Sequence, residues 1–415
     1  MITNNRLTFR VHELVFALIF MLTFTSYSIA EINVSDKIPV IFVAGLLFVK
    51  YIRFCVRFLI NKCFMYLIFL VFGLLGVLFL DSKTRIMLFN MNYFLQIVMF
   101  AVFVYIFSTF NLSYEKFLDI IFKINVFMAI IGILQYFFWE PVTRFTSLFV
   151  DGLYKPLLNG KHRIASFYDN PNMFAGMMVC MSLVGILFWY ETRIRKYLVG
   201  SAIMVVALLF TQTRSALLVL PLGVLHVFFL KWQGRQRQKK TFTLIAASTI
   251  GILYVISKGL LSRLLVVFSG TASLDVMTGK RNIVWGTLLR KGSEHIAYGI
   301  GNGMSEIVTV QELGPRYGPH SMYVGLLSET GLFGGVACLL FIISILMAGR
   351  KIKEKNLKHI FYVLYVAMLF LQISESHLRH FMQFIILFWL VASIPFAEEL
   401  KKKKQEARRI GGMYH

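Results

Sequence analysis

Acidic residues and cysteines are both scarce in this chain of 415 residues. Asp and Glu together number 20 against 43 Lys and Arg, which leaves a net charge of +23. Only four cysteines occur (Cys55, Cys63, Cys180 and Cys338), and their spacing fits neither a metal site nor a disulfide framework. Each lies in or beside an apolar run, so we expect four small buried hydrophobic residues.

The motifs of nucleotide-binding and repeat proteins are also missing. The sequence has no Walker-type glycine-rich loop, no dinucleotide fingerprint and no internal repeat. An enzyme that uses a cytosolic nucleotide-sugar is therefore disfavoured. A transporter built from inverted repeats is disfavoured because the sequence shows no internal repeat.

Apolar residues, in contrast, are abundant. They make up 58% of the chain, and the mean hydropathy is +0.71. This composition predicts an all-α polytopic membrane protein, with residues 1–415 forming a single integral membrane domain. Since a spanning helix needs about 20 mostly apolar residues, we expect about twelve transmembrane helices. They are expected near residues 13–30, 38–57, 63–80, 87–109, 117–139, 173–190, 197–213, 215–231, 241–258, 321–348, 357–374 and 378–397.

Positive charge alternates with the apolar runs. If the N-terminus is inside, the inner segments hold most Lys and Arg, whereas the outer turns hold few. This bias predicts cytoplasmic termini, with residues 398–415 as a basic cytoplasmic tail. Membrane lipids with anionic headgroups are the expected counter-charge, and no nucleic acid is expected as a partner.

Two segments are too long to be simple connections, and both are expected on the outer side. They cover residues 140–172 and residues 259–320. Loops of this size are usually functional or disordered. The second contains short apolar-periodic stretches and glycine-rich turns, which predict a large helical extracytoplasmic loop.

Three candidate catalytic residues follow this topology. Arg214 lies between two apolar runs, where a charge is costly and often marks a polar cavity, although it could instead bind a lipid headgroup or cap a helix. Arg281 opens an amphipathic stretch and could offer its planar fork to phosphate oxygens, or be an ordinary surface cation. His320 follows Gly318-Pro319 and could accept a proton from a hydroxyl, although a structural role is open.

The candidate substrate-binding residues are Arg163, Asn172 and Arg379. Arg163 precedes Asn170-Pro171-Asn172, a turn and helix-start signal, and could hold an anionic group or pair with Asp169. Arg379 belongs to an outer cluster that could line the same cavity or lie at the lipid headgroups. No metal site is expected, because the outer segments contain no Asp-x-Asp pair and no His-x-x-x-His spacing.

One acidic residue lies near the candidate histidine along the chain. Glu329 follows His320 by nine residues, which places the two about 180° apart on an ideal helix. Direct pairing is not expected unless Gly325 or Gly331 breaks the helix.

The order of the short motifs resembles the O-antigen ligase and polymerase family of bacterial cell envelopes. The motifs are Arg163…Asn170-Pro171-Asn172, Thr211-Gln212-Thr213-Arg214-Ser215, Thr278-Gly279-Lys280-Arg281…Trp285, Gly299-Ile300-Gly301 and His320-Ser321-Met322-Tyr323…Glu329-Thr330-Gly331. They cover roughly residues 160–340. Two positions depart from the family pattern: Ser321 stands where Asn is common, and Tyr298 where Pro is common before the Gly-x-Gly.

The resemblance implies a fold of the GT-C type and metal-independent, cofactor-free glycan transfer at the outer face of the bacterial cytoplasmic membrane. The donor would be an undecaprenyl-diphosphate-linked oligosaccharide. Arg214 and Arg281 would hold the diphosphate, His320 would be the base, and Arg163 is a looser match. The acceptor would be another lipid-linked glycan in a polymerase, or lipid A–core in a ligase. A chain-length regulator is a further candidate partner, and a lipid-linked sugar flippase is the alternative of another class.

Overall fold

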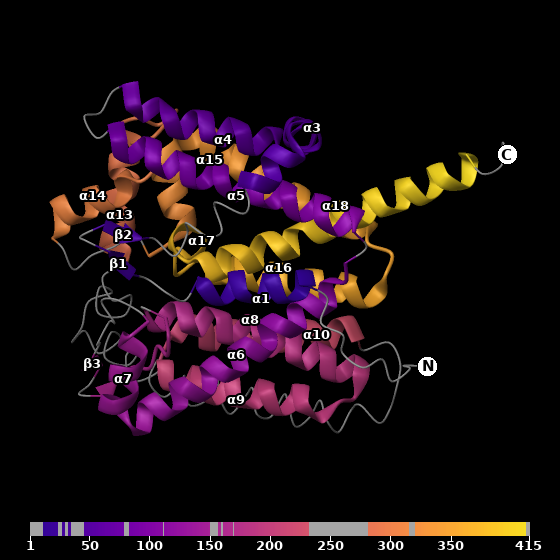
Figure 1. Ribbon diagram of the computed structural model, residues 1–415. Coiled ribbons are helices and arrows are strands. Elements are labelled where there is room, and N and C mark those ends of the chain that lie inside the picture. Colours follow the sequence, from indigo (N-terminus) through magenta and orange to yellow (C-terminus); the bar gives the residue numbers. More distant parts are fainter. Residues whose placement is uncertain are drawn as a thin grey trace. The chain divides into compact units, whose positions relative to one another are not determined.

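The computed structural model describes residues 11–23, 27–29, 32–34, 45–78, 83–110, 112–149, 157–158, 161–168, 170–231, 281–314 and 320–411. This part of the chain is mostly helical, with two short antiparallel strand pairs (Figure 1). The chain divides into two compact units. One comprises Met1–Gly45 and Leu112–Thr213, and the other Leu46–Asn111 and Arg214–His415. Both units therefore join segments that are distant in the sequence.

The first unit is built around helix α8 (Pro171–Thr192), which packs against α9 (Arg195–Thr211) and α6 (Tyr114–Phe137). Most of α8 is buried, because nearly every residue from Pro171 to Phe188 is apolar or small. The other elements of this unit are α1 (Val11–Leu22), β1 (Tyr27–Ile29), β2 (Ile32–Val34), α7 (Trp139–Ser147), β3 (Leu157–Leu158) and β4 (Lys161–His162).

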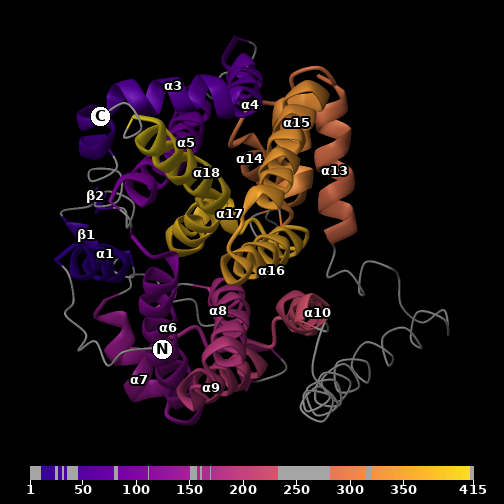
Figure 2. The same cartoon turned by 90° about the vertical axis from the view of Figure 1, so that its right-hand side faces the viewer.

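The second unit is built around α15 (Met322–Ala348), which packs against α4 (Phe64–Leu75) and α13 (Arg281–Ser293) (Figure 2). Two further pairs complete the helical bundle: α18 (Met382–Gly411) with α5 (Lys83–Thr109), and α10 (Arg214–Lys231) with α16 (Lys355–Leu371). The shorter elements are α3 (Ile52–Lys62), η1 (Gly76–Leu78), α14 (Met304–Leu313), η2 (Gly349–Lys351) and α17 (His377–His380).

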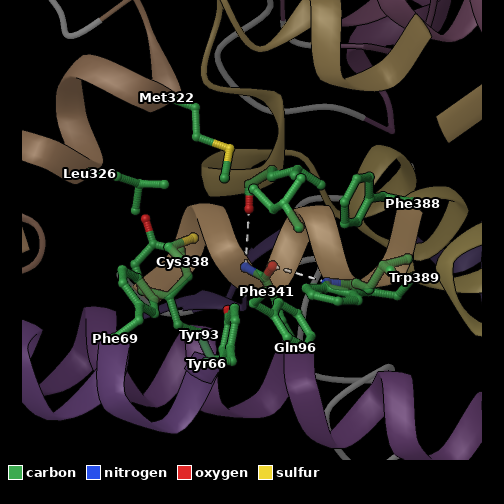
Figure 3. Close-up of a pocket in the computed structure, with 13 residues that line it drawn as sticks. Tyr66, Phe69, Tyr93, Gln96, Met322, Leu326, Cys338, Phe341, Phe388 and Trp389 are labelled. Carbon is green, nitrogen blue, oxygen red and sulfur yellow. Dashed lines mark hydrogen bonds between the residues drawn. The ribbon is translucent and has the colours of Figure 1, made fainter. Parts of the chain in front are cut away.

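The interior of the second unit is aromatic and holds a small apolar cavity of about 20 Å³ (Figure 3). The lining includes the amide side chain of Gln96. Its amide donates to the carbonyl oxygen of Leu378 at 3.0 Å and accepts from the indole of Trp389 at 3.1 Å. A space of this size holds one water molecule at most, so it is not a site for a sugar or a lipid chain. Gln96 instead fixes α17 to the helical core.

Five described helices are long and apolar enough to cross a bilayer, which supports a polytopic membrane protein. They are Arg85–Thr109, Tyr114–Phe137, Pro171–Thr192, Met322–Lys351 and Met382–Ala407. The spans predicted near 197–213, 215–231 and 357–374 coincide with the shorter helices α9, α10 and α16. The predicted number of twelve and the GT-C fold stay predictions. The span near 241–258 and residues 259–280 and 315–319 of the large loop lie outside the described residues.

Two predicted spans differ from the structure. The helix expected over 13–30 ends at Leu22, and Tyr27–Ile29 forms a strand, because its aromatic and β-branched residues suit extended backbone. In the described part of the span expected over 38–57, residues 45–50 are helical and α3 begins at Ile52 after a turn at Tyr51. Helix α3 then meets α4–η1 at an angle of 85°. The cations Lys50 and Arg53 that interrupt this apolar run account for the difference.

Candidate functional site

A buried glutamate joins two of the candidate catalytic residues in the second unit. Arg281 opens α13, and its Nη2 donates to Oε1 of Glu375 at 2.8 Å. Nδ1 of His320 lies 3.4 Å from Oε2 of the same carboxylate. The side chain of Glu375 is 7% exposed, against 29% for Arg281 and 41% for His320. The carboxylate is therefore buried, while the imidazole and the guanidinium are partly exposed at the protein surface.

The position of His320 is fixed by contacts that tie the start of α15 to the end of α16. Ser321 caps α15, with its Oγ accepting from the Val324 amide at 3.5 Å. The Met322 amide donates to the carbonyl oxygen of Gln372 at 3.1 Å, and the Tyr323 hydroxyl to that of Leu369 at 3.0 Å. Asn, which is common at this position in the family that the motifs resemble, is also a good helix cap, so Ser and Asn can both cap α15 here.

The electrostatics of the cluster favour an ionised Glu375. Burial raises the pKa of this carboxyl, but the hydrogen bond with His320 and the charges of His320, Arg281 and His377 outweigh it, so the pKa lies below its ordinary value. When the imidazole of His320 is neutral, an ionised carboxylate next to Nδ1 favours the tautomer that carries a proton there. Nε2 of His320 is then the nitrogen with a free lone pair, as a general base requires.

A second buried ion pair lies in the same unit. Nη2 of Arg379 donates to Oε1 of Glu329 at 2.6 Å, and Nη1 donates to Oγ of Ser305 at 2.8 Å. The Ser305 amide also donates to Oε1 of Glu329, at 2.9 Å. The two charged side chains are 3% and 0% exposed. Arg379, expected to bind substrate, is thus engaged by Glu329. Glu329 pairs with Arg379 and not with His320, and the sequence did not predict this partner.

The glycine motifs bring two backbone segments into close contact beside this pair. Gly299 and Gly331 both have positive φ, of 70° and 64°. A Cβ on Gly299 would lie 2.5 Å from backbone atoms of residues 328–331, and one on Gly331 would lie 2.5 Å from the backbone of Ala297. The Ile300 amide donates to the Ser328 carbonyl oxygen at 3.0 Å. Only glycine combines this conformation with this closeness, which explains both glycine motifs.

The first unit holds a polar cluster around Arg163. Its Nε donates to the carbonyl oxygen of Thr211 at 2.7 Å, and its Nη2 donates to Oδ1 of Asn172 at 2.8 Å and to Oγ1 of Thr213 at 2.9 Å. Asn170 caps α8 with Pro171 at its first position, which confirms the predicted helix start. The Arg163 and Thr211–Thr213 motifs, 48 residues apart, thus meet in space. Asp169, the alternative partner, lies outside the described residues.

Arg214 is placed at the junction of the two units. Gln212 ends α9 in the left-handed conformation, and Arg214 begins α10 as an exposed residue. The connection is as short as the sequence predicted. Arg214 follows Thr213 directly in the sequence.

The sequence did not single out Glu375 as a site residue. The signal that could have found it is the rarity of acids in the chain, combined with its place beside the His377–His380 segment. The four cysteines are free and buried, as expected. Among the described residues, no group of three or more His, Cys, Asp or Glu side chains gathers in a way that could hold a metal ion.

The candidate catalytic residues lie in a segment that matches a protein-family model. Residues 199–339 match the family model described as O-antigen ligase. Arg214, Arg281 and His320 lie inside this range, whereas Glu375 and Arg379 follow it. A comparison with curated protein sequences found no match.

Proposed function

We propose that the chain is a metal-independent glycosyltransferase of the bacterial cytoplasmic membrane, and the match of residues 199–339 to the O-antigen ligase family model supports this proposal. It transfers a glycan from an undecaprenyl-diphosphate carrier to an acceptor hydroxyl outside the cytoplasm. Polymerisation of O-antigen, capsule or exopolysaccharide repeat units is the favoured reaction, and attachment to lipid A–core is the alternative.

The observation that carries this proposal is the Arg281–Glu375–His320 cluster. A histidine held through Nδ1 by a buried carboxylate, beside an accessible arginine, is suited to deprotonate a hydroxyl next to an anionic group. The guanidinium of Arg281 uses Nη2 for Glu375 and has further N–H groups in its fork to offer to phosphate oxygens.

The reaction balances without a further reagent. Nε2 of His320 accepts the proton of the acceptor hydroxyl as its oxygen attacks the anomeric carbon. The bond from that carbon to the diphosphate oxygen breaks, and the diphosphate leaves with the electron pair. Its negative charge grows by one as the bond breaks, and pre-placed arginines stabilise this charge in the transition state. We assign this role to Arg281 and Arg214.

The polar cluster of the first unit is proposed to bind substrate. The hydrogen bond between Nη2 of Arg163 and Oδ1 of Asn172 fixes the two side chains relative to each other, which gives the cluster a defined geometry. Arg379 is the weakest of the proposed substrate ligands, because Glu329 and Ser305 already engage its guanidinium.

An outer location of the reaction is supported by the length of α15. His320 lies two residues before the first residue of this 27-residue helix, which is kinked at Gly331. The basic turn of residues 350–358 follows its other end, where cytoplasmic positive charge is expected. The cluster and the basic turn therefore lie at opposite ends of one membrane-spanning helix.

Reconstitution tests the proposal and separates the two acceptors. The purified chain in lipid receives a defined undecaprenyl-diphosphate oligosaccharide, first alone and then with lipid A–core. Longer lipid-linked glycans from the donor alone identify a polymerase, and product that appears only with lipid A–core identifies a ligase. Absence of any transfer under both conditions, or full transfer by His320→Ala, contradicts the proposed mechanism.

A further inference from the structure

We propose that α3 is an interfacial helix that binds anionic phospholipid headgroups through Arg53 and Arg57. The helix meets α4–η1 at 85°. Because α4 packs along the membrane-spanning helix α15, α3 runs nearly perpendicular to the spanning direction. Figure 1 shows α3 almost end-on, beside α4 and α15 seen along their length. A helix in this orientation lies along a bilayer surface rather than across it.

One face of α3 is fixed against the second unit. Cys55, Phe58 and Leu59 are buried and lie on one side of the helix. The ring of Phe58 packs edge-on against Phe100 of α5 at 5.5 Å and against Phe396 of α18 at 5.8 Å between centroids. The rotation of α3 about its own axis is therefore set by the core, and its other two faces are presented outward.

The second face is apolar and exposed. Ile52, Val56 and Ile60 follow one another at intervals of four residues and form one stripe along the helix. Their exposed fractions are 47%, 41% and 58%. Three branched aliphatic side chains in one outward row are unfavourable in water and favourable against acyl chains.

The third face is basic and lies about 100° further round the helix. It consists of Arg53, Arg57 and Asn61, again at intervals of four residues, and all three are exposed. Within the described part of the chain, neither arginine makes an ion pair or hydrogen bond. An apolar stripe next to a basic stripe is the pattern of a helix at the membrane interface, with one row toward acyl chains and the other toward headgroup phosphates.

The charges around the end of α3 indicate which leaflet it faces. Lys62, the last residue of α3, and Lys351, after α15, both approach Glu399 of α18, at 3.9 and 3.1 Å. The helix therefore lies at the same end of the second unit as the basic turn 350–358. Positive charge collects on the cytoplasmic side, and the cytoplasmic leaflet carries anionic lipid. An anionic phospholipid such as phosphatidylglycerol is thus the ligand that the charge and the location favour.

Lipid binding by the full-length protein tests the affinity. Delipidated protein in detergent is titrated with phosphatidylglycerol and, separately, with phosphatidylcholine, and bound lipid is counted by native mass spectrometry. Each basic residue near an anionic surface raises the binding affinity about fivefold. Arg53→Gln/Arg57→Gln should therefore weaken the tightest phosphatidylglycerol binding by about 25-fold. Phosphatidylcholine binding should be unchanged.

Lys353→Gln/Lys355→Gln is the matched control, because it removes two exposed charges at the same end of the unit, away from any apolar stripe. Equal weakening in both variants would overturn the proposal in favour of general electrostatics, and so would no weakening in the arginine variant. Spin labels at Val56→Cys and Arg57→Cys in bilayer nanodiscs add a test of orientation. Position 56 should be more accessible to oxygen and position 57 to a water-soluble nickel reagent. Equal nickel access at both would mean a solvated helix.

Discussion

At the scale of single residues, Glu375 contributes the most to the candidate site without being visible in the motifs. It contacts Arg281, which lies 94 residues earlier in the sequence, and His320, which lies 55 residues earlier. No local pattern encodes such a meeting, because it depends on how three helices pack. The cations were predictable individually, since an arginine or histidine near a membrane boundary is costly and stands out. A glutamate in a turn between two helices does not stand out in the sequence in this way.

We expect Glu375→Gln to lower kcat by about 10- to 100-fold, because a neutral amide no longer favours the productive His320 tautomer. Glu375→Asp, which keeps the charge, should recover part of the loss. A purely structural role would change the amount of folded protein instead of kcat and its pH profile. Glu294→Gln, at an exposed glutamate that pairs with Lys291, is the matched control and should retain full activity.

The lowered pKa of Glu375 also predicts how stability depends on pH. Its ionised form is favoured in the fold, so its contribution is complete above the ordinary value of 4.5 and is lost as pH falls through the lower folded value. Thermal unfolding in detergent should show this loss below pH 4.5 for the native protein. In Glu375→Gln that part of the pH dependence should be absent; an identical acid profile would contradict the assignment.

At the scale of helices and turns, the Glu329–Arg379 pair fixes the segment 299–305 to α15 and α17. Removing one buried partner leaves an unpaired charge, which costs about 3–5 kcal/mol. Arg379→Met should therefore destabilise the protein strongly, while Glu329→Leu/Arg379→Met should recover most of the stability. Glu312→Ala, which breaks the exposed pair with Arg290, should cost less than about 1 kcal/mol.

The same double variant decides whether Arg379 binds substrate. If the pair is only structural, the rescued protein should also be active. A stable but inactive Glu329→Leu/Arg379→Met variant would instead support the substrate-binding prediction. Thermal unfolding and glycan transfer, measured on the same preparations, separate these outcomes.

Helix positions were largely predictable from the sequence, whereas their bends were not. The apolar runs predict α5, α6, α8 and α15 to within a few residues, and Asn170-Pro171 predicts the start of α8. The bend between α3 and α4 was missed. The number of apolar residues in a segment does not show on which face of the helix each residue lies, and α3 has three different faces. The close contact of Gly299 with residues 328–331 was equally hidden, since it joins two distant turns.

At the scale of the whole molecule, topology is the prediction that underlies the proposed function. Cysteine introduced at position 281 should react with a membrane-impermeant maleimide from the outer side, and cysteine at position 353 only after the cytoplasm is opened. The four native cysteines are buried and should contribute little background. Labelling of position 281 from the cytoplasm alone would overturn both the topology and the outer location of glycan transfer.

The turn between α16 and α17 also affects the order in which the candidate site is assembled during synthesis. Glu375 and Arg379 are synthesised after the residues that they hold. A nascent chain that has inserted only as far as α15 already contains His320 and Arg281 but lacks the carboxylate that orients them. Under the proposed function, membrane insertion of the segment from α16 to α17 completes the site, so chains that have not reached this segment should not consume lipid-linked glycan.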